Sequence, residues 1–176
     1  MSIPLVFKPA TLTDLDIIST IETQSYHPDE AASREQIAHR MNYAIDGDPH
    51  LFYTAWLEQE NNNNNKEEKT LAGFVCTTLG STTLVTDESM KVHDPNGKIV
   101  YLHSVCVHPQ ARRQKVATRL MTHWIQLLEK SKKYDRIALI ARENLIGLYE
   151  SVGFKYLGKS QVVHGPDPWF DMVLDF

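Results

Sequence analysis

Apolar residues in the first half of the chain form short runs and helical repeats. The short runs, rich in aromatic and aliphatic residues, predict strands at residues 5–9, 51–56 and 71–77. Between the first two strands, apolar residues recur at helical spacing in two places. Thr13 is placed to cap the first of these helices, and Ser33 with Gln36 three residues later forms a capping box for the second, which runs through Met41. The two later strands are spaced as a hairpin.

The second half of the chain continues the alternation of strands and helices. Residues 101–107 are predicted to form a strand that leads through a short basic loop into a helix. The core stripe of that helix is Val116, Leu120, Trp124, Leu127 and Leu128. A strand at 136–140, a helix at 143–152 ended by Gly153, and a strand at 154–157 follow.

Length and charge fit one enzyme domain. The chain has 176 residues, of which 42% are hydrophobic, and it shows no internal repeat, so we expect a single domain over residues 1–176. The asparagine-rich stretch at about residues 59–69 is interpreted as a solvated, mobile loop. A formal net charge of −4 gives no general attraction to nucleic acid and suits a cationic small substrate better.

Cysteine usage and hydropathy indicate the cellular compartment in which the protein is expected. Cys76 and Cys106 lie in apolar, strand-like sequence and form neither a disulfide framework nor a metal cluster. No apolar run approaches the ~20 residues of a membrane span, and the first residues lack the pattern of a signal peptide. We therefore expect a cytoplasmic protein without membrane association, metal or obligate protein partner.

The basic loop is a candidate anion site. A helix N-terminus presents backbone N–H groups without intrahelical partners together with the positive end of the helix dipole, so it receives a phosphate well. Arg112, Arg113 and Lys115 add cationic side chains, and Ala117 is small enough for close approach to the backbone. By the period of a strand, His103 lies on the face that Tyr101, Val105 and Val107 share, next to this loop.

These motifs resemble a known family. Residues 112–117 resemble the Arg/Gln-x-x-Gly-x-Gly/Ala loop of the GNAT superfamily of N-acetyltransferases, with Lys115 in place of the first glycine. Residues 88–93, 102–107 and 148–154 are similar, in order, to motifs of the arylalkylamine N-acetyltransferases, the serotonin acetylase group. With residues 25–30, the resemblance extends from about residue 5 to the C-terminus.

The resemblance implies a fold and a cosubstrate. The fold is the acyl-CoA N-acyltransferase fold of the α/β (α+β) class, a mixed, mostly antiparallel sheet flanked by helices, with a parallel splay between the strands at 101–107 and 136–140. The cosubstrate is acetyl-CoA, whose pantetheine arm lies along the first of these strands and whose pyrophosphate lies in the loop. The implied coenzyme-binding residues are Val105, Cys106, Val107, Arg112, Arg113, Gln114, Lys115, Val116, Ala117, Thr118 and Tyr149.

Acetyl transfer to an amine needs a base and an acid. His103 is the candidate base, because imidazole titrates near neutrality, and Tyr149, which matches the family tyrosine facing the coenzyme sulfur, is the candidate acid. Arylalkylamine members carry a second histidine at the position of Tyr101, so a proton relay here is reduced to His103 with water or Tyr101 as a bridge. Cys106 is predicted on the face opposite His103, which favours direct transfer without an acyl-enzyme.

Three functions remain open from the sequence. The first is N-acetylation of small primary amines, either arylalkylamines or polyamines. The second is acetylation of protein N-termini or lysines, and the third is a coenzyme A-binding module without catalysis. Candidate aromatic contacts for an amine are Phe7, Tyr26, Tyr43, Phe52, Phe74 and Trp169. Candidate acidic contacts are Asp29, Glu30, Asp87 and Glu88.

Overall fold

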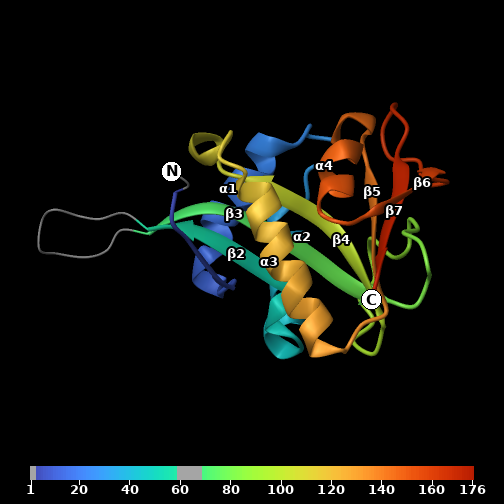
Figure 1. Cartoon of the computed structure of the whole chain (residues 1–176), viewed down its shortest axis with the longest axis horizontal. Helices are drawn as coiled ribbons and strands as arrows, with labels where there is room; N and C mark the ends of the chain where they lie inside the picture. The colour runs from blue at the N-terminus through green and yellow to red at the C-terminus, as the bar shows by residue number, and fades with distance from the viewer. Residues whose placement is uncertain (1–2, 59–68) are drawn as a thin grey trace, which may run out of the picture.

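A seven-stranded mixed sheet forms the centre of the molecule (Figure 1). The computed structural model describes residues 3–58 and 69–176. The strands are β1 (Leu5–Pro9), β2 (Phe52–Leu57), β3 (Thr70–Gly80), β4 (Ile99–Val107), β5 (Arg136–Ala141), β6 (Lys155–Lys159) and β7 (Phe170–Asp175), in the spatial order β1-β2-β3-β4-β5-β7-β6. Only β4 and β5 pair in parallel. The predicted fold class is confirmed, whereas β7 was not predicted.

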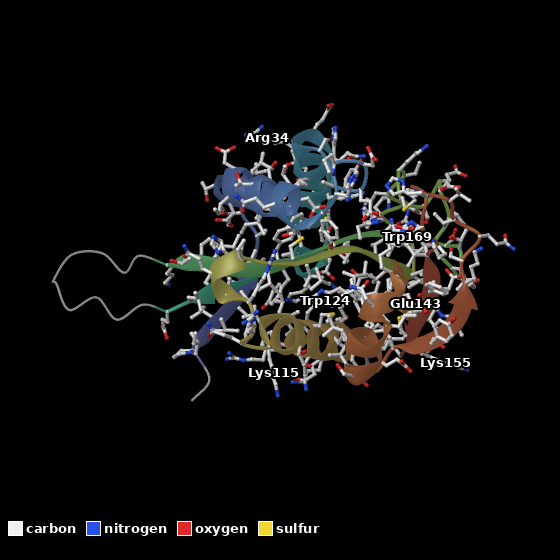
Figure 2. The ribbon with its side chains drawn as sticks, turned by 90° about the horizontal axis from the view of Figure 1, so that it is seen from above. Arg34, Lys115, Trp124, Glu143, Lys155 and Trp169 are labelled. Carbon is white, nitrogen blue, oxygen red and sulfur yellow. The ribbon has the colours of Figure 1, made fainter. Side chains whose placement is uncertain are left out.

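Helices cover both faces of the sheet (Figure 2). Helices α1 (Leu15–Ser25) and α2 (Arg34–Asp46) lie on one face, and α3 (Val116–Ser131) and α4 (Ile146–Ser151) lie on the other. Short 3-10 turns precede several elements, including Glu143–Leu145 before α4, so the predicted helix at 143–152 is divided in two. No helix in the described ranges combines the length and apolar character needed to cross a membrane.

The sequence predicted the N-terminal cap of α2 correctly and that of α1 wrongly. Ser33 accepts a hydrogen bond from the Gln36 backbone N–H at 3.1 Å, and the Gln36 side chain accepts one from the Ser33 N–H at 2.9 Å, so the capping box is confirmed. Thr13 does not cap α1. Thr11 begins a 3-10 turn, its N–H donates to Asp14 at 2.9 Å, and the Thr13 hydroxyl bonds that of Thr11.

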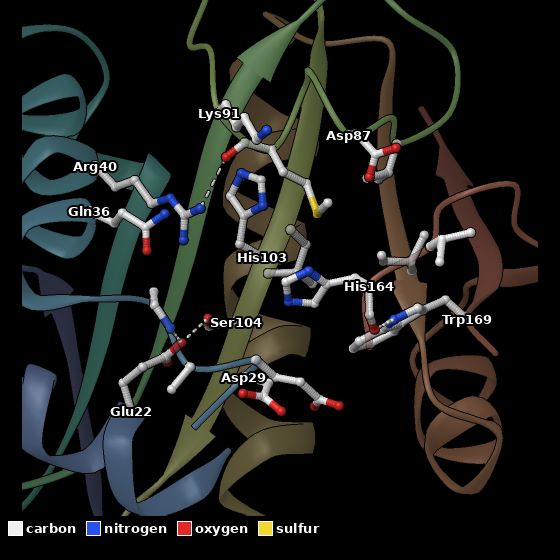
Figure 3. Close-up of a pocket in the computed structure, with 18 residues that line it drawn as sticks. Glu22, Asp29, Gln36, Arg40, Asp87, Lys91, His103, Ser104, His164 and Trp169 are labelled. Atoms are coloured by element: carbon white, nitrogen blue, oxygen red, sulfur yellow. Dashed lines mark hydrogen bonds between the residues drawn. The ribbon is translucent and has the colours of Figure 1, made fainter. Parts of the chain in front are cut away.

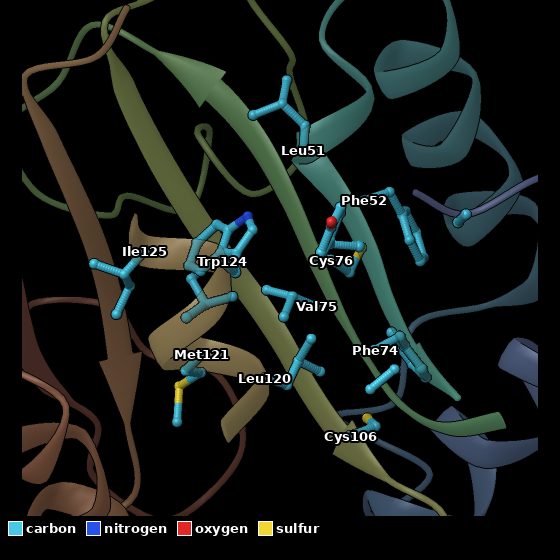
Figure 4. Packing of buried hydrophobic residues seen from close by; sticks show 14 of the residues in the cluster. Leu51, Phe52, Phe74, Val75, Cys76, Cys106, Leu120, Met121, Trp124 and Ile125 are labelled. Carbon is cyan, nitrogen blue, oxygen red and sulfur yellow. The ribbon is translucent and has the colours of Figure 1, made fainter. Parts of the chain in front are cut away.

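The core lies on both faces of the sheet, under α3 on one side and under α1 and α2 on the other; Figure 4 shows the part around α3 and the central strands. Val116, Leu120, Trp124 and Leu128 are buried as the helical stripe predicts, with Leu127 half-buried at its edge. Trp124 has no exposed surface, and its indole N–H donates to the carbonyl of His50 at 2.8 Å. This packing fixes α3, and with it the loop before α3, against the strands that carry the candidate site.

The two central strands separate after three residue pairs. β4 and β5 pair through Ile99–Arg136, Val100–Ile137 and Tyr101–Ala138, and beyond Tyr101 the strand β4 pairs only with β3. The predicted parallel splay is therefore confirmed. Its consequence is an open backbone edge along the second half of β4, where polar groups of the chain are free to bind a ligand as an added strand does.

A β-bulge interrupts β4 at His103. Cys76 pairs with Ser104 and Thr77 with Leu102, so His103 is the extra residue of the bulge. The bulge changes the phase of the strand, and Ser104 and Cys106 both point toward α1, on the same face as His103. The expected faces were therefore wrong: Cys106 does not lie opposite His103, and alternation places Val105 and Val107 on the other face.

Candidate active site

Two adjoining cavities meet at the bulge, and Figure 3 shows the larger of them. The larger has a volume of about 500 Å³ and lies between α2, the loop at residues 85–91 and β4. The smaller, of about 250 Å³, lies in the splay between β4, β5 and α4. Both are lined by Glu22, Glu30, Leu102, His103, Ser104, Ile140 and Trp169. A molecule in one cavity therefore meets a molecule in the other beside His103.

His103 is held as a neutral imidazole. Its Nε2 lies 2.7 Å from the hydroxyl oxygen of Thr78 on the neighbouring strand. Burial, together with the positive charge of Arg40, holds the pKa of His103 well below its ordinary value. At pH 7 the ring therefore has a nitrogen lone pair, as a general base requires.

Tyr149 borders the same small cavity from the opposite side of the splay. Its ring is buried and packs edge-on against Phe154, with ring centroids 5.7 Å apart. Burial and the nearby Cys106 raise the pKa of Tyr149 well above its ordinary value, so the phenol keeps its proton. The structure thus places both predicted catalytic residues, His103 and Tyr149, on the walls of one cavity.

Tyr101 does not face these cavities with its hydroxyl. The hydroxyl donates to the carbonyl of Thr82 at 2.6 Å and lies 2.6 Å from the Thr82 hydroxyl. Its ring lies against Gly80, where a Cβ atom would come within 2.4 Å of it. Tyr101 therefore packs the loop after β3, and of the two bridges considered from the sequence, water or Tyr101, the one through the Tyr101 hydroxyl is not formed.

Glu22 on α1 is the main residue of the site that the sequence did not reveal. Only 2% of its surface is exposed, and it lines both cavities. Its carboxylate accepts hydrogen bonds from the Ala32 N–H at 3.1 Å, the Ser104 hydroxyl at 3.0 Å and the Cys106 thiol at 3.1 Å. A signal existed, because Glu22 falls four residues after Ile18, on the buried stripe of the helix.

Cys106 is a poor nucleophile in this setting. Burial and the adjacent carboxylate of Glu22 raise the pKa of the Cys106 thiol well above its ordinary value. Because the thiolate is the reactive form, a protonated thiol disfavours an acyl-enzyme. Direct transfer therefore remains the expected route, although the reason given for it from the strand faces was wrong.

The candidate aromatic and acidic contacts divide between the cavities and the rest of the fold. Tyr26, Trp169, Asp29, Glu30 and Asp87 line a cavity. Phe52 and Phe74 belong to the buried core, Phe7 stacks on His123, Tyr43 stacks on His93, and Glu88 lines neither cavity. Trp169 lies at the junction, with the guanidinium of Arg142 3.9 Å from its ring centroid.

Comparison with known proteins assigns a family to this arrangement. Residues 15–154, most of the chain, match the sequence profile of the acetyltransferase (GNAT) family. The chain belongs to the GNAT family. A serotonin N-acetyltransferase from Mesocricetus auratus is 29% identical over 98 residues, which are 56% of this chain and 47% of that protein. The chain thus spans about half the length of the curated relatives that it matches.

Solved GNAT structures share the fold at low identity. The loading GNATL domain of CurA from Lyngbya majuscula superposes with a TM-score of 0.77 at 12% identity, covering 98% of both chains. An N-acetyltransferase from Thermoplasma acidophilum, solved in complex with coenzyme A, gives a TM-score of 0.66 at 15% identity, covering 98% of this chain and 99% of that chain. At these identities the likeness establishes the fold alone.

The GNAT loop takes its shape here without the usual glycine. Lys115 has φ 57° and Arg113 has φ 66°, which is the left-handed region that glycine prefers. Lys115 is the N-cap of α3, and the first turn of that helix carries no acidic residue. Arg112, Arg113 and Lys115 are exposed and form no ion pair with any residue that the structure describes. Three cations therefore surround a helix N-terminus, and residues 3–58 and 69–176 supply no anion that pairs with them.

The remaining predicted coenzyme residues border the loop or the open strand edge. Val116 is buried, so it offers only its backbone, whereas Gln114, Ala117 and Thr118 are half-buried. The Val105 carbonyl lies 3.5 Å from the Tyr26 hydroxyl, beside the small cavity. The Cys106 side chain is turned toward Glu22, so Cys106 too offers its backbone at this edge.

Proposed function

We propose that this protein transfers the acetyl group of acetyl-CoA directly to the nitrogen of a small primary amine. One observation carries the proposal: His103 and Tyr149 line the same 250 Å³ cavity in the splay, and His103 also lines the larger cavity beside it. The thioester occupies the splay, and the amine enters from the larger cavity. Membership of the GNAT family supports acetyl-CoA as the cosubstrate.

The coenzyme is held by backbone groups and surface charge. Its pantetheine arm lies along the open edge of β4 and bonds the backbone of Val105 and Val107. Its pyrophosphate oxygens accept hydrogen bonds from the backbone N–H groups of residues 113–118, at the positive end of the α3 dipole. The exposed side chains of Arg112, Arg113 and Lys115 add to the attraction.

Proton transfer follows from the two titratable groups. A primary alkylamine has a pKa near ~10, so about one molecule in a thousand is neutral at pH 7. His103 takes the proton of the amine, directly or through water, as the nitrogen attacks the thioester carbonyl. When the tetrahedral intermediate collapses, the C–S bond breaks and Tyr149 protonates the departing thiolate. The products are the N-acetylated amine and coenzyme A, and proton transfer from the imidazolium of His103 to the phenolate of Tyr149, through water, restores both groups.

Two classes of small amine fit the lining of the larger cavity. Trp169 supplies an aromatic wall for an arylalkylamine such as serotonin or tryptamine. Asp29 and Asp87 supply exposed carboxylates at its mouth, which attract a polyamine. Both classes are small primary amines.

The test is a panel of acceptors assayed by thiol release from acetyl-CoA. Serotonin, phenylethylamine, spermine and a histone tail peptide are compared by kcat/KM, with wild type and His103→Gln, and with His39→Gln as an exposed-histidine control. Amine-dependent thiol release that His103→Gln lowers and His39→Gln does not supports the proposal. Binding of coenzyme A without acetylation of any acceptor identifies a coenzyme-binding module instead, and acetylation of the peptide alone identifies a protein acetyltransferase.

A further inference from the structure

A buried cation in the wall of the larger cavity has no counter-ion. Arg40 on α2 is 9% exposed and lines this cavity. Its guanidinium donates to the carbonyl oxygen of Met90 at 3.2 Å, and no carboxylate within residues 3–58 and 69–176 forms an ion pair with it. A guanidinium stays charged in proteins, and a buried charge that only neutral groups contact is costly. The cavity is therefore electrostatically suited to an anion at this point.

A buried anion lies in the same wall, also without a counter-ion. The three recorded hydrogen-bond donors to Glu22 are all neutral, namely the Ala32 N–H, the Ser104 hydroxyl and the Cys106 thiol. No ion pair joins Glu22 to Arg40 or to another cation of the described chain. Figure 3 shows Arg40 beside His103 and Glu22 beside Ser104, both on the α1/α2 side of the cavity. The wall of the larger cavity thus contains two opposite charges, Arg40 and Glu22, at separate positions.

The two charges differ in their position relative to the splay, where the thioester is proposed to bind. Glu22 lines both cavities and therefore lies at the junction with the splay, whereas Arg40 lines only the larger cavity. An ammonium group at the junction contacts Glu22 and reaches His103, which can take its proton. A second group of the same molecule extends from there toward Arg40.

We propose that the preferred acceptor is an amino carboxylate, with its amine at Glu22 and His103 and its carboxylate bound by Arg40. This inference rests on the proposed amine acetylation and narrows its substrate class. The planar guanidinium matches a carboxylate in two parallel hydrogen bonds. An arylalkylamine leaves Arg40 without a counter-ion, and a polyamine brings a second positive charge toward it. The charges at the mouth, Asp29, Asp87 and Lys91, are exposed and screened by solvent, so they discriminate less.

Matched pairs of acceptors test the carboxylate directly. Tryptophan and tryptamine, and phenylalanine and phenylethylamine, differ only in that group. In wild type we expect a higher kcat/KM for the carboxylated member of each pair. Because the two amines also differ in basicity, the decisive quantity is the change in this ratio between variants. Arg40→Met should lower the ratio by at least about 100-fold, and Arg40→Lys by less, because the charge remains.

Arg34→Met is the matched control. Arg34 lies on the same helix but is exposed and pairs with Asp16, so its replacement should leave the ratio unchanged. A ratio that is the same in wild type and Arg40→Met overturns the proposal. Because Arg40→Met removes a buried charge that lacks a counter-ion, its thermal stability without ligand should equal or exceed that of wild type. A melting curve checks that the variant is folded, and Arg40→Lys provides the comparison if it is not.

A binding measurement separates this inference from the proposed function. With coenzyme A present, tryptophan should raise the melting temperature of wild type more than tryptamine does, and Arg40→Met should abolish the difference. If this pattern holds while no amine is acetylated, the carboxylate site stands and the proposed function fails. If tryptamine is acetylated and stabilises the protein as well as tryptophan does, the proposed function stands and the carboxylate site fails.

Discussion

His103 and Thr78 lie on neighbouring strands with Nε2 and the threonine hydroxyl oxygen 2.7 Å apart. Thr78 pairs with Tyr101 in the β-ladder, so the bulge brings His103 within reach of a residue that is not its ladder partner. When Nε2 carries the proton and donates a hydrogen bond to the Thr78 hydroxyl, the lone pair of the ring is on Nδ1. Nδ1 has no hydrogen-bond partner among the described residues. Thr78 is in this way a positioning residue for the base.

Thr78→Val should therefore lower activity by misplacing the imidazole. The substitution keeps the shape of the side chain and removes its hydroxyl, and we expect kcat/KM to fall about 10-fold, as for other supports of a general base. Thr78→Ser retains the hydroxyl and should stay within about threefold of wild type. Steady-state kinetics with acetyl-CoA measures both. An unchanged Thr78→Val enzyme would show that the hydrogen bond does not direct the base.

His103→Gln should lower kcat/KM about 10- to 1000-fold at pH 7, because it removes the base that neutralises the amine. The loss should shrink as the pH rises toward the pKa of the amine. Steady-state kinetics over a pH series measures it.

The depressed pKa of His103 in the folded state also affects the stability of the protein. The unfolded chain binds more protons below pH ~6.5, so wild type loses stability as the pH falls below that value. His103→Gln should lose less on acidification in a melting series from pH 7 to pH 5.

Tyr149→Phe should lower kcat while leaving the affinity for coenzyme A nearly unchanged. The ring keeps its edge-on contact with Phe154, and only the proton donor is removed, for which we expect a loss of about 10- to 100-fold. Calorimetric titration with coenzyme A checks binding, and single-turnover kinetics checks the transfer step. Tyr156→Phe, at an exposed position, is the control. Weakened coenzyme binding with unchanged kcat would assign Tyr149 to packing alone.

Lys115→Gly should raise thermal stability and weaken coenzyme A binding or leave it level. A left-handed conformation costs a residue with a Cβ about 1 kcal/mol, and glycine removes that cost. Lys132 also has a positive φ, of 55°, at the C-cap of α3, so Lys132→Gly should give a similar gain in stability without any change in affinity. Clear tightening of coenzyme A by Lys115→Gly alone would show that the lysine side chain obstructs the phosphates.

Cys106→Ala should leave turnover within about threefold of wild type, because the protonated thiol takes no part in direct transfer. Stability should fall by about 1–2 kcal/mol, since Glu22 loses one of its hydrogen-bond donors. Cys76→Ala removes a second buried thiol, which contacts Arg40 instead of Glu22, and gives the comparison for stability. An inactive Cys106→Ala enzyme, together with an acetylated Cys106 in the wild-type protein by mass spectrometry, would replace direct transfer by a covalent mechanism.

Local patterns in the sequence sufficed for most of the fold. The capping box at Ser33 and the buried stripe of α3 each depend on residues a few positions apart, so local spacing in the sequence reveals them. Strand β7 was missed because its apolar run, Met172 to Leu174, is only three residues long and has an aspartate on each side, Asp171 and Asp175. Its place in the sheet depends on ladders to β5 and β6, which a pattern within β7 itself does not reveal.

The site was less predictable than the fold, because its geometry depends on distant partners. Glu22 is a buried carboxylate only because Ser104 and Cys106, more than 80 positions later, donate to it. Arg40 is separated by 50 positions from Met90, its recorded hydrogen-bond acceptor. Neither of these long-range contacts produces a periodic pattern in the sequence. His103 and Tyr149 were found through motifs, and the cavity that they share supports those roles without testing them.

The bulge at His103 also governs how this strand tolerates insertion and deletion. Two consecutive side chains, His103 and Ser104, reach the same cavity because the strand carries one residue more than its partner. Removing that residue would restore simple alternation and leave Leu102 and Ser104 opposite Thr77 and Cys76, but it would take the candidate base out of the cavity. In an alignment with other sequences, a one-residue gap in β4 therefore changes which positions correspond chemically. Residues on the two sides of the bulge must be matched separately, each half in its own phase.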